Sequence, residues 1–352
     1  MVARGEWMGK CEKANVNQQL MQFKKIIFII LVLGLLLLVN YYLPSRMNPY
    51  LFQILILIGI NIMLAVSLNL INGFTGQFSI GHAGFMAIGG YTSAFLTYYF
   101  GANLIQSLSS ILFFPWLAKS IIFVFALISG GLLAALAGLV VGIPSLRLKG
   151  DYLAIATLGF GEIIRVLILN IDAVGGARGF ADIPGYTNLF WVLFFMLLTI
   201  IVVRNLVYST HGRAFLSVRE DEVAAEAMGI NTTYYKIYAF IIGAFFAGIA
   251  GGLFGHYLMY LHTNSFTFMK SIEVIIMVVL GGMGSITGSI LAAIIMTILP
   301  EFLRIVKDYR MVIYSLTLII LMLTRPQGIF GVEEFSLRKI RNLFVRKEQI
   351  IK

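Results

Sequence analysis

Apolar stretches long enough to cross a lipid bilayer recur along this chain of 352 residues, from residue 26 almost to residue 324. A helix needs about 20 residues, at about 1.5 Å each, to span roughly 30 Å of hydrocarbon. Only 12% of the residues are charged and 59% are hydrophobic, whereas soluble domains carry about 25% charged residues. The sequence therefore predicts an all-α fold, a polytopic membrane helical bundle with no stretch left over for a separate soluble domain.

Hydropathy and helix breakers predict about ten membrane spans, several of them broken or short. The first span resembles the apolar region of a signal peptide, but it runs on into Asn40-Tyr41-Tyr42-Leu43-Pro44 without a small-residue cleavage site. We therefore expect it to be a retained helix. The expected spans are residues 26–43, 51–71, 78–100, 120–142, 152–170, 189–208, 237–257, 271–283, 285–300 and 311–324.

The distribution of Lys and Arg predicts the orientation of the chain. Polar segments at residues 1–25, 143–151, 204–236 and 325–352 hold 18 of the 26 basic residues. Cytoplasmic segments of membrane proteins are enriched in Lys and Arg, and an even number of spans places all four segments on that side. This predicts a cytoplasmic N-terminal tail at 1–25, a membrane domain at 26–324 and a basic cytoplasmic C-terminal tail at 325–352.

Composition also excludes several classes of protein. A formal charge of +10 is common in nucleic-acid-binding proteins, but the basic residues here lie in short segments between apolar spans, so no nucleic acid is expected. A single cysteine, Cys11, excludes an intrachain disulfide framework and a Cys-rich metal site. The four histidines are scattered, and there is no His-Glu-x-x-His motif. A membrane enzyme with its own catalytic residues or metal is therefore not expected.

Two glycine-rich interruptions do not look like ordinary helices, one at residues 72–77 that continues to residue 84, the other at residues 281–284. Unwound backbone persists at membrane depth only where protein buries it or water lines it, and paired breaks often mark a translocation path. Their glycine spacings leave open a diverged internal repeat. The path candidates here are Gly76, Gln77, Ser79, His82, Gly281, Gly282 and Gly284. For Gln77, Ser79 and His82 the alternative is that they only satisfy freed backbone groups.

An ionisable side chain inside a membrane span is energetically costly, so each one is expected to have a structural or functional role. Glu162 and Arg165 lie three residues apart and can share a helix face, so they are either a structural ion pair or a path contact. Glu273, near the start of a short span, is a further candidate for a path or interface contact.

The longest hydrophilic interruption within the membrane domain is residues 209–236. It is rich in Ala and Glu, and Gly229 followed by Asn231 is a suitable stop, so a single short cytoplasmic helix is expected. A charged helix with an Ala face could dock on a motor protein, and the alternative is a solvated connector. The coupling candidates are Arg213, Arg219, Glu220, Asp221, Glu222, Ala225 and Gly229.

This segment resembles the cytoplasmic EAA loop of importers of the ATP-binding-cassette class, with an acidic-Ala-Ala stretch before a glycine. More specific stretches resemble the LivM-type permease of branched-chain amino-acid importers, and they occur in that family's order between residues 60 and 331. The stretches are Ser67-Leu68-Asn69-Leu70, Gly76-Gln77-Phe78-Ser79-Ile80-Gly81-His82-Ala83-Gly84-Phe85, residues 148–165, Gly212-Arg213-Ala214 with Arg219-Glu220-Asp221-Glu222, Val278-Val279-Leu280-Gly281-Gly282-Met283-Gly284-Ser285, and Arg325-Pro326-Gln327-Gly328.

The resemblance implies a permease domain in the bacterial cytoplasmic (inner) membrane that pairs with a homologous permease subunit, as a heterodimer. It also implies two ABC ATPase subunits, which bind ATP and Mg, and an extracytoplasmic substrate-binding protein. The sequence contains no Gly-x-x-x-x-Gly-Lys-[Ser/Thr] motif, so this chain is expected to bind no cofactor and to have no ATPase site. The expected substrates are Leu, Ile and Val. The alternatives are a urea, amide or other amino-acid substrate, or a stand-alone secondary transporter.

Overall fold

The computed structural model describes residues 34–112, 115–145 and 151–303, together with Leu31, Leu316, Ile319 and Gly328. The chain divides into two compact units, Met1–Phe52 and Gln53–Lys352. In the first unit residues 34–46 are helical. The expected tail at 1–25 lies outside the described residues, as do most of the expected span at 311–324 and of the tail at 325–352.

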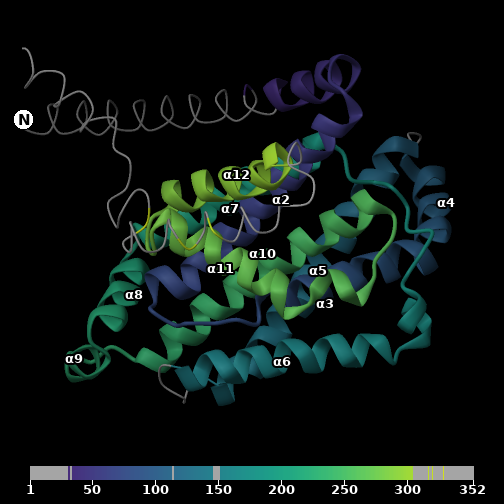
Figure 1. Cartoon of the computed structure of the whole chain (residues 1–352). Coiled ribbons are helices and arrows are strands. Elements are labelled where there is room, and N and C mark those ends of the chain that lie inside the picture. Colours follow the sequence, from purple (N-terminus) through teal and green to yellow (C-terminus); the bar gives the residue numbers. More distant parts are fainter. Residues whose placement is uncertain are drawn as a thin grey trace, which may run out of the picture. The chain divides into compact units, whose positions relative to one another are not determined.

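The second unit is a bundle of helices, and its described residues contain no strand apart from an isolated bridge between Phe180 and Leu261 (Figure 1). The predicted all-α helical bundle is confirmed. In chain order the elements are α2 (Pro49–Asn69), η1 (Leu70–Phe74), α3 (His82–Phe95), η2 (Leu96–Phe100), α4 (Gly101–Leu112), α5 (Pro115–Ser145), α6 (Asp151–Leu169), η3 (Asp172–Val174), η4 (Gly176–Arg178), α7 (Leu189–Val207), α8 (Thr210–Glu220), α9 (Glu222–Ala227), α10 (Thr232–Leu258), η5 (Thr263–Phe266), α11 (Phe268–Gly281) and α12 (Ile286–Phe302).

Six described segments are long and apolar enough to cross a membrane. They are Pro49–Phe74, Pro115–Pro144, Tyr152–Leu169, Leu189–Val207, Thr232–Leu258 and Thr263–Gly281, and a shorter apolar helix follows at Ile286–Phe302. Together with this shorter helix they overlap seven of the eight spans predicted between residues 51 and 300, and the span predicted at 78–100 is not among them. The span predicted at 78–100 begins as a helix only at His82 and ends in the π-helix η2.

Helices α3, α5 and α10 pack tightly at the centre of the second unit, where three glycines meet. A Cβ added to Gly130 of α5 would lie 2.6 Å from the carbonyl oxygen of Gly89 in α3. A Cβ on Gly89 would in turn collide with the backbone of Gly248 in α10. The small residues spaced four apart in α10 therefore serve close helix packing. Gly248, Gly251 and Gly252 are all buried there.

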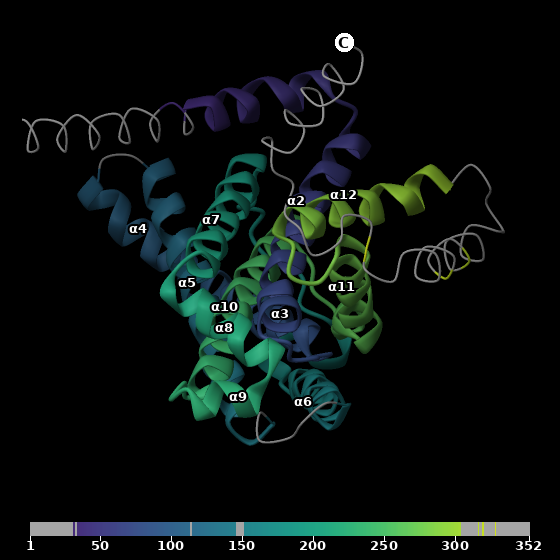
Figure 2. The same ribbon diagram turned by 90° about the vertical axis from the view of Figure 1, so that its left-hand side faces the viewer.

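Helices α11 and α12 form a hairpin beside α2 and α3 (Figure 2). α11 has 14 residues and α12 has 17. At about 1.5 Å per residue α11 reaches only about 21 Å, which is less than a full bilayer core. The turn that joins the two helices therefore lies within the protein, where neighbouring elements must satisfy its backbone.

Candidate functional site: a coupling segment joined to two broken helices

The first break in the helices separates α2 from α3. The helix of α2 continues through Asn72 and Gly73 as the π-helix η1, so the prediction that these residues are unwound was wrong. Widening to a π-helix keeps the backbone hydrogen bonded until Phe74. The residues from Thr75 to Gly81 belong to no helix, and Gly76 adopts a φ of 68°. The true interruption is thus shorter than expected.

The backbone of this first break is held by polar side chains from three other helices. Asn72 accepts a hydrogen bond from Ser79 N at 3.2 Å, and Thr157 of α6 accepts one from Ile80 N at 3.0 Å. The hydroxyl of Ser271 in α11 accepts a hydrogen bond from Ala83 N at 3.0 Å. Neither Thr157 nor Ser271 was selected from the sequence, because a Ser or Thr in an apolar span carries no distinctive signal.

Three path candidates in this break keep buried polar atoms without a partner among the described residues. Gln77 is 3% exposed, yet both polar atoms of its carboxamide are unpartnered. The same holds for the hydroxyl of Ser79 and for Nδ1 of His82, whose Nε2 lies 2.9 Å from the hydroxyl of Ser67. Buried polar groups are normally hydrogen bonded. A hydrogen bond with Ser67 therefore accounts for Nε2 of His82, whereas the side chains of Gln77 and Ser79 have no partner among the described residues.

The second break lies between α11 and α12, at the expected glycines. α11 ends at Gly281, and Gly282 and Gly284 adopt φ angles of 103° and 88°. Ser285 then caps α12 by accepting a hydrogen bond from Gly288 N at 3.1 Å. Positive φ angles of this kind favour glycine, because a Cβ would strain the backbone.

The two breaks touch each other through Asn69 of α2. Its Nδ2 donates to the carbonyl oxygen of Ser285 at 3.0 Å, and its Oδ1 accepts from Gly284 N at 2.9 Å. A Cβ on Gly73 would collide with Oδ1 of Asn69 and with the backbone nitrogen of Gly284. Asn69 was not among the predicted site residues, although it lies in one of the recognised stretches. Only its partners, more than 200 residues away, reveal its role.

The predicted coupling loop contains two helices, so the prediction of a single short helix was wrong. α8 ends at Glu220, and Asp221 interrupts it with extended angles of φ −157° and ψ 114°. The carboxylate of Asp221 accepts hydrogen bonds from Val223 N at 2.9 Å and Ala224 N at 3.1 Å, and so starts α9. Asp is a preferred N-cap residue, and this local capping competes with helix continuation. α10 begins at Thr232, within the predicted loop.

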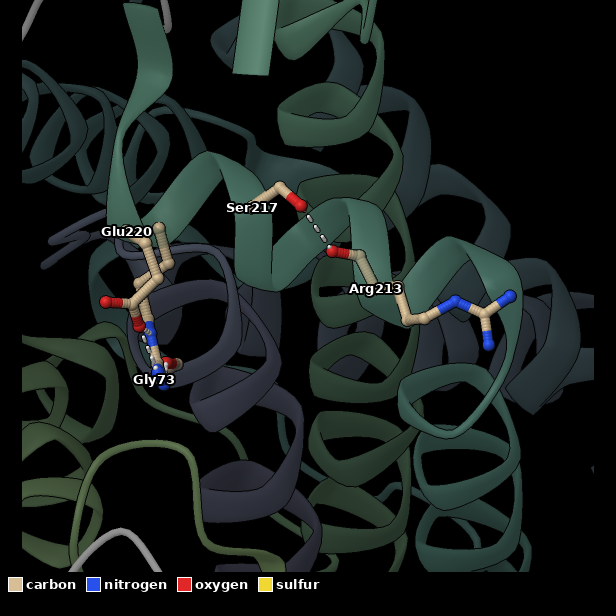
Figure 3. A network of polar contacts seen from close by, with 5 residues as sticks. Gly73, Arg213, Ser217 and Glu220 are labelled. Atoms are coloured by element: carbon tan, nitrogen blue, oxygen red, sulfur yellow. Dashed lines mark hydrogen bonds and ion pairs between the residues drawn. The ribbon is translucent and has the colours of Figure 1, made fainter. Parts of the chain in front are cut away.

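Arg219, at the end of α8, contacts both breaks from the coupling segment, which comprises α8 and α9. Figure 3 shows its neighbour Glu220 beside Gly73. Nη1 of Arg219 donates to the carbonyl oxygen of Gly73 at 3.1 Å, and its Nη2 pairs with Glu220 at 2.6 Å. A Cβ on Gly76 would lie 3.0 Å from Cγ of Arg219, and one on Gly284 would lie 2.8 Å from Nη1. Gly76 and Gly284 thus leave room for this arginine side chain.

Among the remaining coupling candidates, some are buried or paired with α10, and Arg213 is exposed. Ala225 is buried, and Gly229 with a φ of 82° ends α9, where Ile230 N donates to the carbonyl oxygen of Ala225 at 3.0 Å. Glu222 pairs with Lys236 of α10 at 2.5 Å. Arg213 is exposed, and in Figure 3 its guanidinium points away from the Gly73 cluster.

Two ion pairs lie on the membrane helices. Arg165 and Glu162 of α6 pair at 2.7 Å, the geometry expected of the structural alternative. Glu273 pairs with Lys270 at 3.0 Å, and the ammonium of Lys270 also lies 3.3 Å from Oδ1 of Asn61 in α2. All four charged side chains are partly exposed. Among the described residues, no group of His, Cys, Asp and Glu is suited to a metal ion.

A bundle of apolar spans interrupted by two glycine-rich breaks, with a polar helical segment in contact with both, is the architecture of a membrane transport subunit of the permease class. Residues 50–322 match the family model of the branched-chain amino acid transport system permease component. The chain therefore belongs to this family.

Curated relatives agree with this assignment. The chain is 35% identical over 325 residues to the high-affinity branched-chain amino acid transport system permease protein LivM of Escherichia coli strain K12, covering 82% of this chain and 72% of that protein. It is 28% identical to a probable LivM of Methanocaldococcus jannaschii, over 72% of this chain and 81% of that protein. A LivH permease of Escherichia coli strain K12 is 34% identical over 46% of this chain and 53% of its own length. No solved structure matches the chain.

Proposed function

We propose that this chain forms, with a homologous permease subunit, the translocation path of an ATP-driven importer for the branched-chain amino acids Leu, Ile and Val. The substrate class follows from the names of its LivM relatives. The similarity to LivH over part of the chain supports a second, homologous permease as the partner. ATP and Mg would be bound by two separate ATPase subunits, and an extracytoplasmic binding protein would deliver the substrate.

The observation that carries this proposal is the contact of Arg219 with both helix breaks. A motor that pulls on α8 and α9 would move Arg219, and with it the carbonyl of Gly73 and the turn at Gly284. Interactions with a charged group contribute about 1.5–3 kcal/mol each. A contact of this strength can shift the equilibrium between two conformations of the breaks without making either of them permanent.

The docking surface for the motor would be the outer face of α9. Val223 is 68% exposed and Met228 is 83% exposed, although the surrounding segment is polar. Val223 lies in the first turn of α9 and Met228 is its C-cap, so exposed apolar side chains mark both ends of this helix, and such side chains are suited to a groove on a partner protein. Glu222 and Glu226 fasten the opposite face of α9 to Lys236 and Thr232 of α10, so a load on α9 would reach the membrane helices.

The substrate would pass close to the first break. Branched-chain amino acids have a zwitterionic head, and a carboxamide offers both a donor and an acceptor to such a head. Gln77 has both atoms unpartnered while the break is closed around it. We assign Gln77, Ser79 and His82 to this path. Glu162, Arg165 and Glu273 are assigned to pairs that position helices next to it.

The location that fits this function is a bacterial cytoplasmic (inner) membrane, with α8, α9 and both termini on the cytoplasmic side. On this assignment the long apolar helices run between a cytoplasmic boundary beside α8 and an outer boundary at the loop before α7.

The proposal is tested by reconstituting the chain in liposomes with a homologous permease, the ATPase subunits and a binding protein from the same organism. Uptake of labelled leucine is expected to require ATP and every subunit, and the chain alone is expected to transport nothing. Uptake by the chain alone, driven by an ion gradient, would contradict the proposal and favour a secondary transporter. A ligand screen of the binding protein that finds urea or amides instead would keep the architecture and replace the substrate.

A further inference from the structure

A pocket of about 430 Å³ opens at the end of the bundle opposite to the coupling segment. α7 begins beside this pocket at Leu189 and ends at Val207, next to α8. Its 19 residues correspond to about 28 Å, roughly one bilayer core. The pocket therefore lies at the other membrane boundary. It is lined by Trp116, Lys119, Ser120 and Phe123 of α5, by Gly185, Tyr186 and Asn188 of the loop, and by Trp191 of α7.

One wall of this pocket is a contiguous set of aromatic rings. The ring of Phe123 lies 5.8 Å from that of Trp191 and 6.0 Å from that of Tyr186, centroid to centroid. The ring of Tyr186 stacks on His256 of α10 with an interplanar angle of 15°. Burial raises the pKa of the Tyr186 phenol, so it stays a neutral hydrogen-bond donor near pH 7. Because these rings pack against one another, this wall is already formed before a ligand binds.

The single charged residue of the lining is Lys119. Its side chain is exposed, and its ammonium makes no hydrogen bond or ion pair with any residue that the structure describes. The polar side chains beside it are those of Ser120 and Asn188, and no carboxylate lines the pocket. Lys119 can therefore offer all three of its N–H donors to an anion.

The surroundings of the pocket distinguish a lipid from a small soluble anion. Trp116 at the rim is 66% exposed, and Trp and Lys are typical of the membrane–water boundary. Leu198 and Val202 follow Trp191 at 7 and 11 residues, so they share its face of α7, and they are 37% and 36% exposed. Acyl chains can lie along this apolar face below the cation, whereas a free phosphate would leave it unused.

We propose that this pocket binds the phosphate headgroup of an anionic phospholipid at Lys119, with its acyl chains along Trp191, Leu198 and Val202. The site is separate from the proposed translocation path. It would hold the loop that precedes α7, and through Tyr186 the outer end of α10, in a fixed position at the membrane surface.

The experiment uses the fluorescence of Trp116 and Trp191, which are two of the three tryptophans of the chain. A Trp7→Phe chain, full length, is reconstituted with brominated phosphatidylglycerol or brominated phosphatidylcholine, and quenching gives the relative affinity of the two lipids. One lysine near a membrane surface favours an anionic lipid about fivefold. A preference of that size for phosphatidylglycerol is expected. Lys119→Arg should keep it, and Lys119→Gln should abolish it.

The matched control is Arg178→Gln, which removes an exposed positive charge from the loop before α7 but outside the pocket lining. It should retain the lipid preference. Equal quenching by both lipids in the unsubstituted pocket, or an undiminished preference in Lys119→Gln, would overturn the proposal. If inorganic phosphate in detergent changes the fluorescence with saturation and phosphatidylglycerol does not compete, the pocket is a free-anion site and the lipid assignment is wrong. Thermal unfolding of each variant confirms that it is folded.

Discussion

The guanidinium of Arg219 donates a hydrogen bond of 3.1 Å to the carbonyl oxygen of Gly73, a residue 146 positions earlier in the chain. This contact joins the end of α8 to the π-helix η1, which immediately precedes the first break. Since the Gly73 backbone also lies against Gly284, one side chain reaches both interruptions of the bundle. The predictions below follow from this arrangement and from the groups around it.

Replacing Arg219 should uncouple ATP hydrolysis from transport. Arg219→Lys keeps the charge, but an ammonium group cannot contact Gly73 and Glu220 through two fixed nitrogens as the guanidinium does. Uptake should therefore fall at least about tenfold, which corresponds to the loss of one charge-assisted hydrogen bond. ATPase subunits should still bind. Uptake and ATP hydrolysis are measured together in liposomes, with Arg178→Gln as the control at the opposite boundary. Normal coupled uptake by Arg219→Lys would remove the linking role.

Gly73→Ala should destabilise the contact between the two breaks. The added methyl group would collide with Oδ1 of Asn69 and the backbone of Gly284, and overpacking of this kind typically costs about 1–3 kcal/mol. A lower melting temperature in detergent and a loss of uptake are expected. Gly159→Ala is the matched control, because nothing lies within 4 Å of the position of its Cβ. Equal melting temperatures for the two variants would contradict the close approach.

Asp221 should act on α9 as a cap. Asp221→Ala should expose the amides of Val223 and Ala224 to faster hydrogen exchange and cost about 1 kcal/mol, whereas Asp221→Asn should keep most of the protection. If Asp221→Asn and Asp221→Ala both retain the ATPase subunits but lose coupled transport, the charge is needed in addition to the cap. Charge reversal at Glu220 or Asp221 should uncouple transport while the chain still inserts.

A substitution at Gln77 distinguishes a role in transport from a role in stability. Its buried carboxamide has no partner among the described residues, so Gln77→Met should leave the free energy of unfolding unchanged or raise it by about 1–3 kcal/mol. Leucine uptake should nevertheless fall. Asn72→Leu is the contrasting variant, since its carboxamide bonds the backbone of Ser79 and its loss should destabilise the protein. Full uptake by Gln77→Met would exclude Gln77 from the path.

The two ends of the bundle should face opposite sides of the membrane. In a Cys11→Ser chain, Met228→Cys on α9 should react with a membrane-impermeant thiol reagent only after the cells are opened, and Ala181→Cys in the loop before α7 should react from outside. Both positions are exposed. Labelling of Met228→Cys in intact cells would reverse the orientation and remove the docking assignment.

The sequence alone determined the class of fold, the family and most of the helices. The length of an apolar run fixes how far it can reach across a bilayer, and closely spaced glycines lower the local preference for helix, so both signals are local. The breaks at residues 76–81 and 282–284 and the pairing of Glu162 with Arg165 were therefore accessible without coordinates. The sequence did not show which of two competing local conformations forms. The helix of α2 continues through Gly73 as a π-helix, and the Asp221 cap divides the coupling segment into two helices.

Only the tertiary structure decided which of these local features meet. Asn69 contacts Gly284 across 215 positions, and Arg219 contacts Gly73 across 146. No periodicity or spacing encodes such pairs, because they depend on how α2, α8 and the hairpin of α11 and α12 pack against one another. Whether a buried carboxamide such as that of Gln77 finds a partner is likewise a property of its neighbours in space, and those neighbours come from distant parts of the chain.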